Sequence, residues 1–170
     1  SVAETYAEKL AAEVAKIVVG PAFDDGVKVG PLIEDKAIDK VEKHVAAIKT
    51  DGGRVLTGGS RHDLGGRFFQ PTVTLGGDDA LFREEETFGP MIPVFAFDTE
   101  DEAVAIANDT AYGLTNYVQS QDGARRNRLA RQLRAGMIEM NGESRGRGAA
   151  FGGVKASGRA REGGVWGLEE

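Results

Sequence analysis

Apolar residues recur at helical spacing in two segments near the beginning of the chain. Residues 2–18 follow a period close to 3.6, with Ser1 as a possible N-cap and Gly20 and Pro21 as a stop signal. The second segment ends at residues 52–53, and its apolar positions are Ile38, Val41, Val45 and Ile48. The pattern therefore predicts two helices, each with one apolar face.

Shorter apolar runs predict five strands, at residues 54–57, 68–75, 91–97, 114–119 and 136–140. Pro71 has no backbone N–H to donate, so the second strand is expected to lie at a sheet edge or to be bent. Two more helices are predicted, one capped by Asp98 or Thr99 and one over residues 122–133. This alternation predicts an α/β fold with a largely parallel sheet and helices on both faces.

The periodic pattern breaks off after Met140, and about a third of residues 141–164 are glycine. The whole chain has 24 glycines in 170 residues, which is about twice the usual glycine share of ~7 %. Glycine follows no three-residue period, which excludes a collagen-like chain. In open α/β sheets, ligands bind beyond the carboxyl ends of strands, so we expect a site where the glycine-rich segment leaves the strand at 136–140.

Size and charge narrow the possible functions. A chain of 170 residues can form one hydrophobic core, and no apolar run is long enough to span a membrane. The net charge of −6 argues against nucleic acid or an anionic membrane as a partner. Residues 1–19 show no apolar signal block, which favours a cytoplasmic location. The arginines of residues 125–134 are interpreted as a solvated helix face.

Common catalytic motifs are missing from the sequence. Residues 146–151 begin as G-x-G-x-x but end in Phe151, and residues 152–157 never place Gly-Lys-Ser/Thr together, so neither a Rossmann fingerprint nor a Walker loop is predicted. His44 and His62 lack further ligands at metal spacing and are interpreted as incidental, so no metal site is expected. The chain has no cysteine and no G-x-S-x-G elbow.

Three consecutive glutamates at residues 84–86 precede Thr87, Phe88, Gly89 and Pro90. They could form an acidic turn. Alternatively, one carboxylate could accept hydrogen bonds from a vicinal diol such as a ribose, while Phe88 packs on a flat ring. Spacing alone leaves both interpretations open.

Residues 85–90, E-E-T-F-G-P, resemble the E-E-x-F-G-P signature of the aldehyde dehydrogenase superfamily. Five other family motifs occur along the chain, and all six stand in the family's order. The five others are G-P-L-I at residues 30–33, F-Q-P-T-V at 69–73, A-N-D-T-A-Y-G-L at 107–114, Met140 with Asn141, and F-G-G-V-K-A-S-G at 151–158. Six ordered motifs across nearly the whole chain carry the resemblance.

The resemblance implies an oxidoreductase that converts an aldehyde to a carboxylic acid with NAD or NADP. In the family, a cysteine forms a thiohemiacetal and then a thioester, and a glutamate activates water. By resemblance, Glu86 would bind the nicotinamide ribose hydroxyls, and Phe88 would contact the nicotinamide side of the cofactor. Asn141 and Phe151, with residues 141–148 more loosely, would line the aldehyde tunnel. Lys155 and Ser157 would support that loop.

The resemblance also implies that residues 1–170 are the C-terminal part of a catalytic domain. The cysteine, the general base and the cofactor-binding domain would precede it, and a C-terminal oligomerisation strand would follow it. No catalytic residue is then expected in this chain, which would be inactive alone and part of a homo-oligomer when complete. The alternatives are a non-catalytic ligand-binding or assembly module of the same fold and an unrelated glycine-rich α/β binding domain.

The tunnel loop departs from the family's pattern in two details. Ala150 replaces the usual proline, and the loop is about one residue short, so roles at residues 142–149 cannot be transferred individually. The last sixteen residues resemble the succinate-semialdehyde branch. Arg145 and Arg147 could pair with an acidic substrate tail or could simply be solvated.

Overall fold

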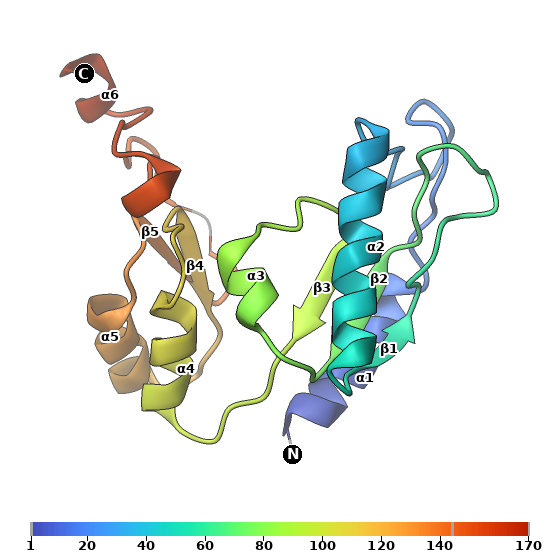
Figure 1. Ribbon diagram of the computed structural model, residues 1–170. Coiled ribbons are helices and arrows are strands. Elements are labelled where there is room, and N and C mark those ends of the chain that lie inside the picture. The colour runs from blue at the N-terminus through green and yellow to red at the C-terminus, as the bar shows by residue number, and fades with distance from the viewer. Residues whose placement is uncertain (1, 144, 170) are drawn as a thin grey trace. The chain divides into compact units, whose positions relative to one another are not determined.

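The computed structural model describes residues 2–143 and 145–169, and the chain forms two compact units, Ser1–Ala96 and Phe97–Glu170 (Figure 1). The N-cap expected at Ser1 lies outside the described residues, as do Ser144 of the tunnel loop and Glu170 of the terminal motif.

The first unit holds three helices and a three-stranded sheet. Its elements are α1 (Val2–Val14), α2 (Asp35–Thr50), β1 (Arg54–Thr57), β2 (Thr72–Leu75), α3 (Ala80–Glu84) and β3 (Met91–Val94). The strand order is β1-β2-β3, with β1 antiparallel and β3 parallel to β2. The sheet is therefore mixed, with β2 at its centre.

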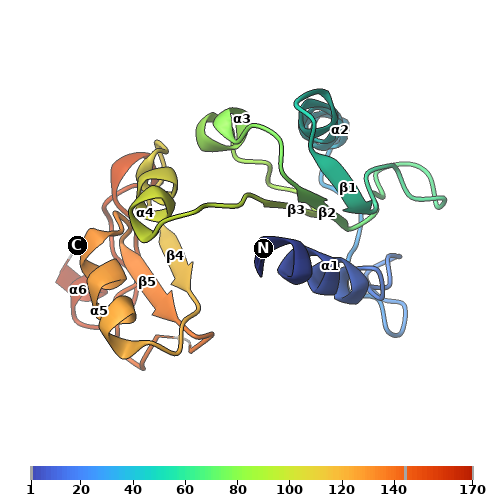
Figure 2. The same cartoon turned by 90° about the horizontal axis from the view of Figure 1, so that it is seen from below.

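Helices α1 and α2 cover opposite faces of this sheet (Figure 2). Side chains of successive strand residues point to alternate faces, so neighbours on one strand enter different clusters. On β1, Val55 packs against the α2 cluster, whereas its neighbour Leu56 packs with α1. The α2 cluster contains the apolar stripe Ile38, Val41, Val45 and Ile48, which is almost fully buried. Helices on both faces, as the sequence predicts, are thus confirmed for this unit.

Some boundaries differ from the prediction for local reasons. The strand expected at residues 68–75 begins only at Thr72, because Pro71 has no N–H to donate. Phe69 instead makes an isolated antiparallel bridge to Arg61. Pro93 is tolerated in β3 because that strand forms an edge of the sheet. The sequence pattern does not predict α3, which has only five residues.

The second unit is built around a parallel strand pair. Its elements are α4 (Glu100–Asn108), β4 (Thr115–Val118), α5 (Gly123–Gln132), β5 (Met137–Met140), η1 (Lys155–Ser157) and α6 (Trp166–Glu169). Thr99 caps α4 by accepting a hydrogen bond from the backbone N–H of Glu102, as predicted. Among the described residues, Val118 is the only buried apolar side chain of this unit that belongs to the core.

The arginine run at residues 125–134, on α5 and just after it, is not simply solvated. Arg125 and Arg128 both bind the carboxylate of Glu100 on α4, at 3.0 and 2.9 Å. Arg126 donates to the backbone carbonyl of Ser120. Three of the five arginines therefore hold parts of the unit together.

The α/β class is confirmed, and two of the three strand pairings are parallel. A search of the described residues finds no helix of the length and apolar character needed to cross a membrane.

Candidate functional site

The loop at residues 85–90, called here the motif loop, connects α3 to β3 and rests on α2. The Lys43 ammonium lies 2.6 Å from a carboxylate oxygen of Glu85. The Lys40 ammonium donates to the backbone carbonyl of Glu86 at 2.9 Å. Three of the loop's residues are thus held from one helix, because the Thr87 hydroxyl also hydrogen-bonds the His44 ring, with Oγ1 2.7 Å from Nδ1.

Gly89 brings the motif loop into direct contact with the α2 core. A Cβ at this position would lie 2.4 Å from Cγ2 of Val41, closer than side chains can approach. Since Val41 is fully buried, it has little room to move away. Glycine is therefore required here for close packing, whatever the loop binds.

The structure separates the two adjacent glutamates that spacing could not separate. Glu85 is half-buried and ion-paired, and Lys43 lowers its pKa by hydrogen bonding. Glu86 is exposed, and within the described part of the chain its carboxylate has no hydrogen-bond or ion-pair partner. Of the two, Glu86 is the carboxylate available to a ligand.

His44 is fully buried beneath the motif loop. Burial is the main cause that lowers its pKa, because the charged ring would be desolvated, and Lys43 and Lys40 act in the same direction. Glu85 opposes this shift from 3.6 Å. The edge of the ring also faces Phe82 of α3, with the ring centroids 4.9 Å apart. His44 is consequently neutral in the folded protein near pH 7.

Phe88 is held in an unusual backbone conformation, with φ at +47°. Side chains other than glycine rarely adopt this region, which costs roughly 1–2 kcal/mol. The side chain is 77 % exposed and so gains little from packing. A strained backbone that presents an aromatic ring to solvent is typical of a binding position.

The second expected site segment lies in the other unit. Phe151 makes two backbone hydrogen bonds with Glu162, at 2.8 and 2.7 Å, which close the glycine-rich segment into a loop. The Arg145 guanidinium lies over the Phe151 ring, 4.6 Å from its centroid. The loop therefore places a cation on an aromatic face.

Asn141 has a structural contact that the sequence did not reveal. Its side-chain oxygen accepts from the N–H of Ser120, and its side-chain nitrogen donates to the carbonyl of Ser120. Its φ of +55° suits asparagine better than most residues. Both polar atoms are thus engaged by the backbone after β4, and a role in the aldehyde tunnel stays a prediction.

Lys155 and Ser157 hold the glycine-rich segment against residues 108–113. The Lys155 ammonium donates to the carbonyls of Asn108 and Thr110, and the Ser157 hydroxyl accepts from the N–H of Gly113. The supporting role predicted for both residues is confirmed by these contacts.

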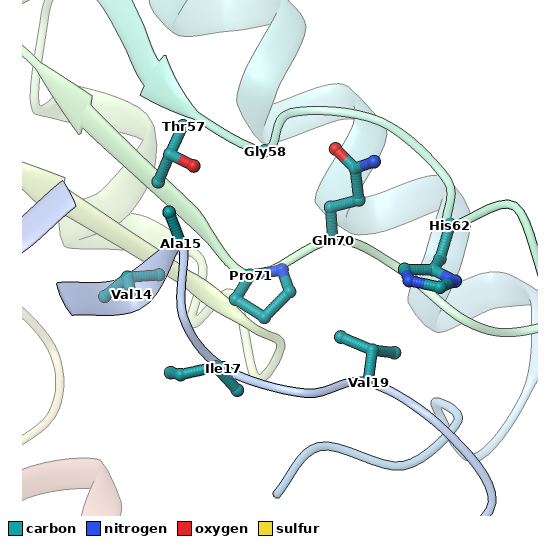
Figure 3. A pocket seen from close by; sticks show the side chains of 9 residues that line it. All are labelled: Val14, Ala15, Ile17, Val19, Thr57, Gly58, His62, Gln70 and Pro71. Atoms are coloured by element: carbon teal, nitrogen blue, oxygen red, sulfur yellow. The ribbon is translucent and has the colours of Figure 1, made fainter. Parts of the chain in front are cut away.

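The sequence-predicted site residues form two groups. Glu86 and Phe88 lie together on the motif loop of the first unit, and Asn141 and Phe151 both belong to the second unit. A separate cavity of about 240 Å³ lies in the first unit between the end of α1, the end of β1 at Thr57 and Pro71, which precedes β2 (Figure 3). None of the predicted site residues lines it. In the residues that could be searched, no group of acidic, histidine or cysteine side chains could hold a metal ion.

Sequence reasoning missed His44, which it interpreted as incidental. A signal was present, because His44 follows Val41 by three residues and precedes Ile48 by four, on the apolar face of α2. A polar residue inside an apolar stripe is expected to need a buried partner. Its partner, Thr87, could not be identified from helical spacing.

The aldehyde dehydrogenase family model matches residues 1–170. Glutarate-semialdehyde dehydrogenase of Pseudomonas aeruginosa is 45 % identical over 169 residues, which are 98 % of this chain and 35 % of that protein. The NADP⁺-dependent succinate-semialdehyde dehydrogenase of Escherichia coli is 43 % identical, with the same coverage.

A crystal structure of succinate-semialdehyde dehydrogenase from Burkholderia pseudomallei superposes with a TM-score of 0.94 at 45 % identity, over 99 % of this chain and 35 % of that one. The chain therefore spans about a third of the length of these relatives. Its motifs, its fold and the match along its entire length show that the chain belongs to the aldehyde dehydrogenase family.

Proposed function

We propose that residues 1–170 form the C-terminal part of the catalytic domain of an NAD(P)-dependent aldehyde dehydrogenase. We further propose that the complete enzyme is a cytoplasmic homo-oligomer. Its cofactor-binding domain would lie in a segment outside these 170 residues. The observation that carries it is the motif loop, where the Glu86 carboxylate is free while the side chains of Glu85 and Thr87 are held by α2. NAD or NADP, when bound, accepts the hydride taken from the substrate.

The residues of the motif loop fit the nicotinamide riboside end of such a cofactor. An exposed carboxylate can accept two hydrogen bonds from the hydroxyls of a ribose. Phe88, two residues further on, offers an aromatic surface to a flat ring. Both side chains are presented by a loop whose other residues are fixed, so little conformational freedom would be lost on binding.

The neighbouring glutamates provide a matched test in the full-length enzyme that carries this segment. We expect Glu86→Gln to raise the KM for NAD(P)⁺ by about 10- to 100-fold, the effect of weakening charged hydrogen bonds. Glu85→Gln should change that KM much less, because Glu85 faces Lys43. Equal effects of the two substitutions would contradict the assignment of Glu86.

We propose further that the substrate is an aldehyde with a carboxylate tail. Arg145 and Arg147 are exposed on the tunnel loop, and no ion pair of either is found among the described residues. A guanidinium can bind a carboxylate with two parallel hydrogen bonds. The names of the two curated relatives, which act on glutarate and succinate semialdehyde, agree with such a substrate.

Replacing both Arg145 and Arg147 by alanine should raise the KM for succinate semialdehyde selectively. The KM for a neutral aldehyde of similar length should stay within about twofold, since no charge is recognised there. The double replacement of Arg131 and Arg134 by alanine, both exposed, is the matched control for loss of two positive charges. An equal rise for both aldehydes would overturn the proposed substrate class.

An assay of the isolated chain tests whether this segment has catalytic activity without the rest of the enzyme. Because it has no cysteine, we expect no aldehyde-dependent formation of NAD(P)H by residues 1–170 alone. Turnover by this chain would refute the proposal. A full-length protein that binds NAD(P)⁺ but oxidises no aldehyde would instead favour a non-catalytic module.

A further inference from the structure

His44 makes a hydrogen bond at the centre of the motif loop. Its Nδ1 lies 2.7 Å from Oγ1 of Thr87, and Thr87 stands directly between Glu86 and Phe88. The ring is fully buried, whereas both of those neighbours are exposed. Thr87 therefore cannot leave this contact without moving the two side chains proposed to meet the cofactor.

The surroundings of His44 favour one arrangement of hydrogens in this bond. Nε2 has no hydrogen-bond partner among the described residues, but a carboxylate oxygen of Glu85 lies 3.6 Å away. A neutral ring with its hydrogen on Nε2 directs that N–H toward negative charge. Nδ1 then accepts a hydrogen bond from the Thr87 hydroxyl. The bond is 2.7 Å long and part-buried, with the His44 ring fully buried, so solvent competes for it less than for an exposed bond.

The strain at Phe88 needs support from neighbouring residues. Its φ of +47° is unfavourable, and its exposed ring makes little contact that could offset the cost. Anchors exist on both sides of it. The His44–Thr87 bond precedes it, and the contact between Gly89 and Val41 follows it. Loss of either anchor would let the loop relax toward ordinary backbone angles.

We propose that His44 is a positioning residue for cofactor binding, which acts through Thr87 to hold Glu86 and Phe88 in place. This inference rests on the proposed function of the motif loop. It assigns His44 no contact with substrate or cofactor.

The test compares substitutions that remove the bond with one that restores it, in the full-length enzyme. His44→Leu and Thr87→Val each keep apolar bulk but lose the bond. We expect each to raise the KM for NAD(P)⁺ by about 3- to 10-fold, with the KM for the aldehyde unchanged. His44→Asn keeps a polar group near the position of Nδ1 and should recover most of the affinity. The double variant should be no worse than either single one, because both remove the same bond.

Ile48→Val is the matched control for loss of stability. Ile48 is fully buried on the same helix, four residues beyond His44, and packs in the α2 core cluster. This variant should lower the unfolding temperature without changing the KM for NAD(P)⁺. Should His44→Leu fail to accumulate as folded enzyme, Thr87→Val carries the comparison alone.

Two results would overturn the inference. One is an unchanged KM for NAD(P)⁺ in Thr87→Val, and the other is a strictly additive double variant. Failure of the proposed function looks different, because Glu86→Gln would then have no effect on cofactor affinity. An effect of Glu86→Gln without an effect of Thr87→Val refutes only the role of His44.

Discussion

The motif loop of the first unit rests on side chains of α2, whereas the glycine-rich segment of the second unit rests mainly on backbone groups. In the first unit, Lys43 and His44 bind the loop, and Val41 packs on it. In the second unit, Gly136 meets the carbonyl of Gly152, and Phe151 pairs with the backbone of Glu162. The two segments are thus ordered by different means.

The two kinds of support follow from the cores of the units. All the buried hydrophobic core residues except Val118 belong to the first unit, within the described part of the chain. A unit with a large core can anchor a loop by side-chain packing. A unit with little core must use backbone hydrogen bonds and close approach, and close approach requires glycine. The comparison predicts that substitutions will be tolerated differently in the two segments.

The largest effect is expected from Gly136→Ala. A Cβ there would lie 1.9 Å from the carbonyl oxygen of Gly152, and backbone atoms cannot move aside easily. We expect the second unit to lose more than about 3 kcal/mol of stability. Hydrogen exchange over residues 136–164 of the full-length enzyme measures this loss. Gly146→Ala is the control, since nothing lies within 4 Å of its Cβ; similar exchange in both variants would contradict the comparison.

A smaller effect is expected from Gly89→Ala in the first unit. The added Cβ would meet the side chain of Val41, so the expected loss is about 1–3 kcal/mol. The second substitution Val41→Ala should restore part of this stability by making room. Combining Gly136→Ala with the shortening of a neighbouring side chain should not restore stability in this way. Additive losses in Gly89→Ala/Val41→Ala would remove the proposed distinction between the units.

Asn141→Ala should cost about 1–2 kcal/mol, through the loss of two hydrogen bonds to Ser120 and strain at positive φ. Asn141→Gly loses the same bonds but relieves the strain, so its loss should be smaller. Exchange rates of the amides at the carboxyl end of β4 report the difference. If both variants match the unsubstituted enzyme, the Asn141 side chain does not support the loop.

The smallest effect concerns pH and the first unit. Burial lowers the pKa of His44, so the folded state favours the neutral ring more than the unfolded state does. The resulting stability is complete above the unfolded pKa of about 6.5 and is lost as pH falls through the folded pKa. The difference in unfolding free energy between the enzyme and His44→Asn should therefore shrink below pH 6.5. A difference that is constant with pH would contradict a buried neutral His44.

Local pattern was sufficient to predict most elements of both units. The stripe of Ile38, Val41, Val45 and Ile48 predicts α2, and Thr99 marks the start of α4. The hydrophobic pattern did not predict features that depend on contacts between elements. Helix α3 is too short to show a period, and its position is supported by packing on α2. The division into two units was also not visible, because apolar spacing does not reveal how elements group.

The sequence by itself determined the family resemblance, the alternation of helices and strands, and the absence of a cysteine from these 170 residues. Only the tertiary structure decided which of two adjacent glutamates is free, and that the Asn141 amide is bound to Ser120. The physical reason is distance along the chain. Periodicity reports the geometry of a single element, whereas His44 and Thr87 are 43 residues apart and meet only because α2 packs under the motif loop.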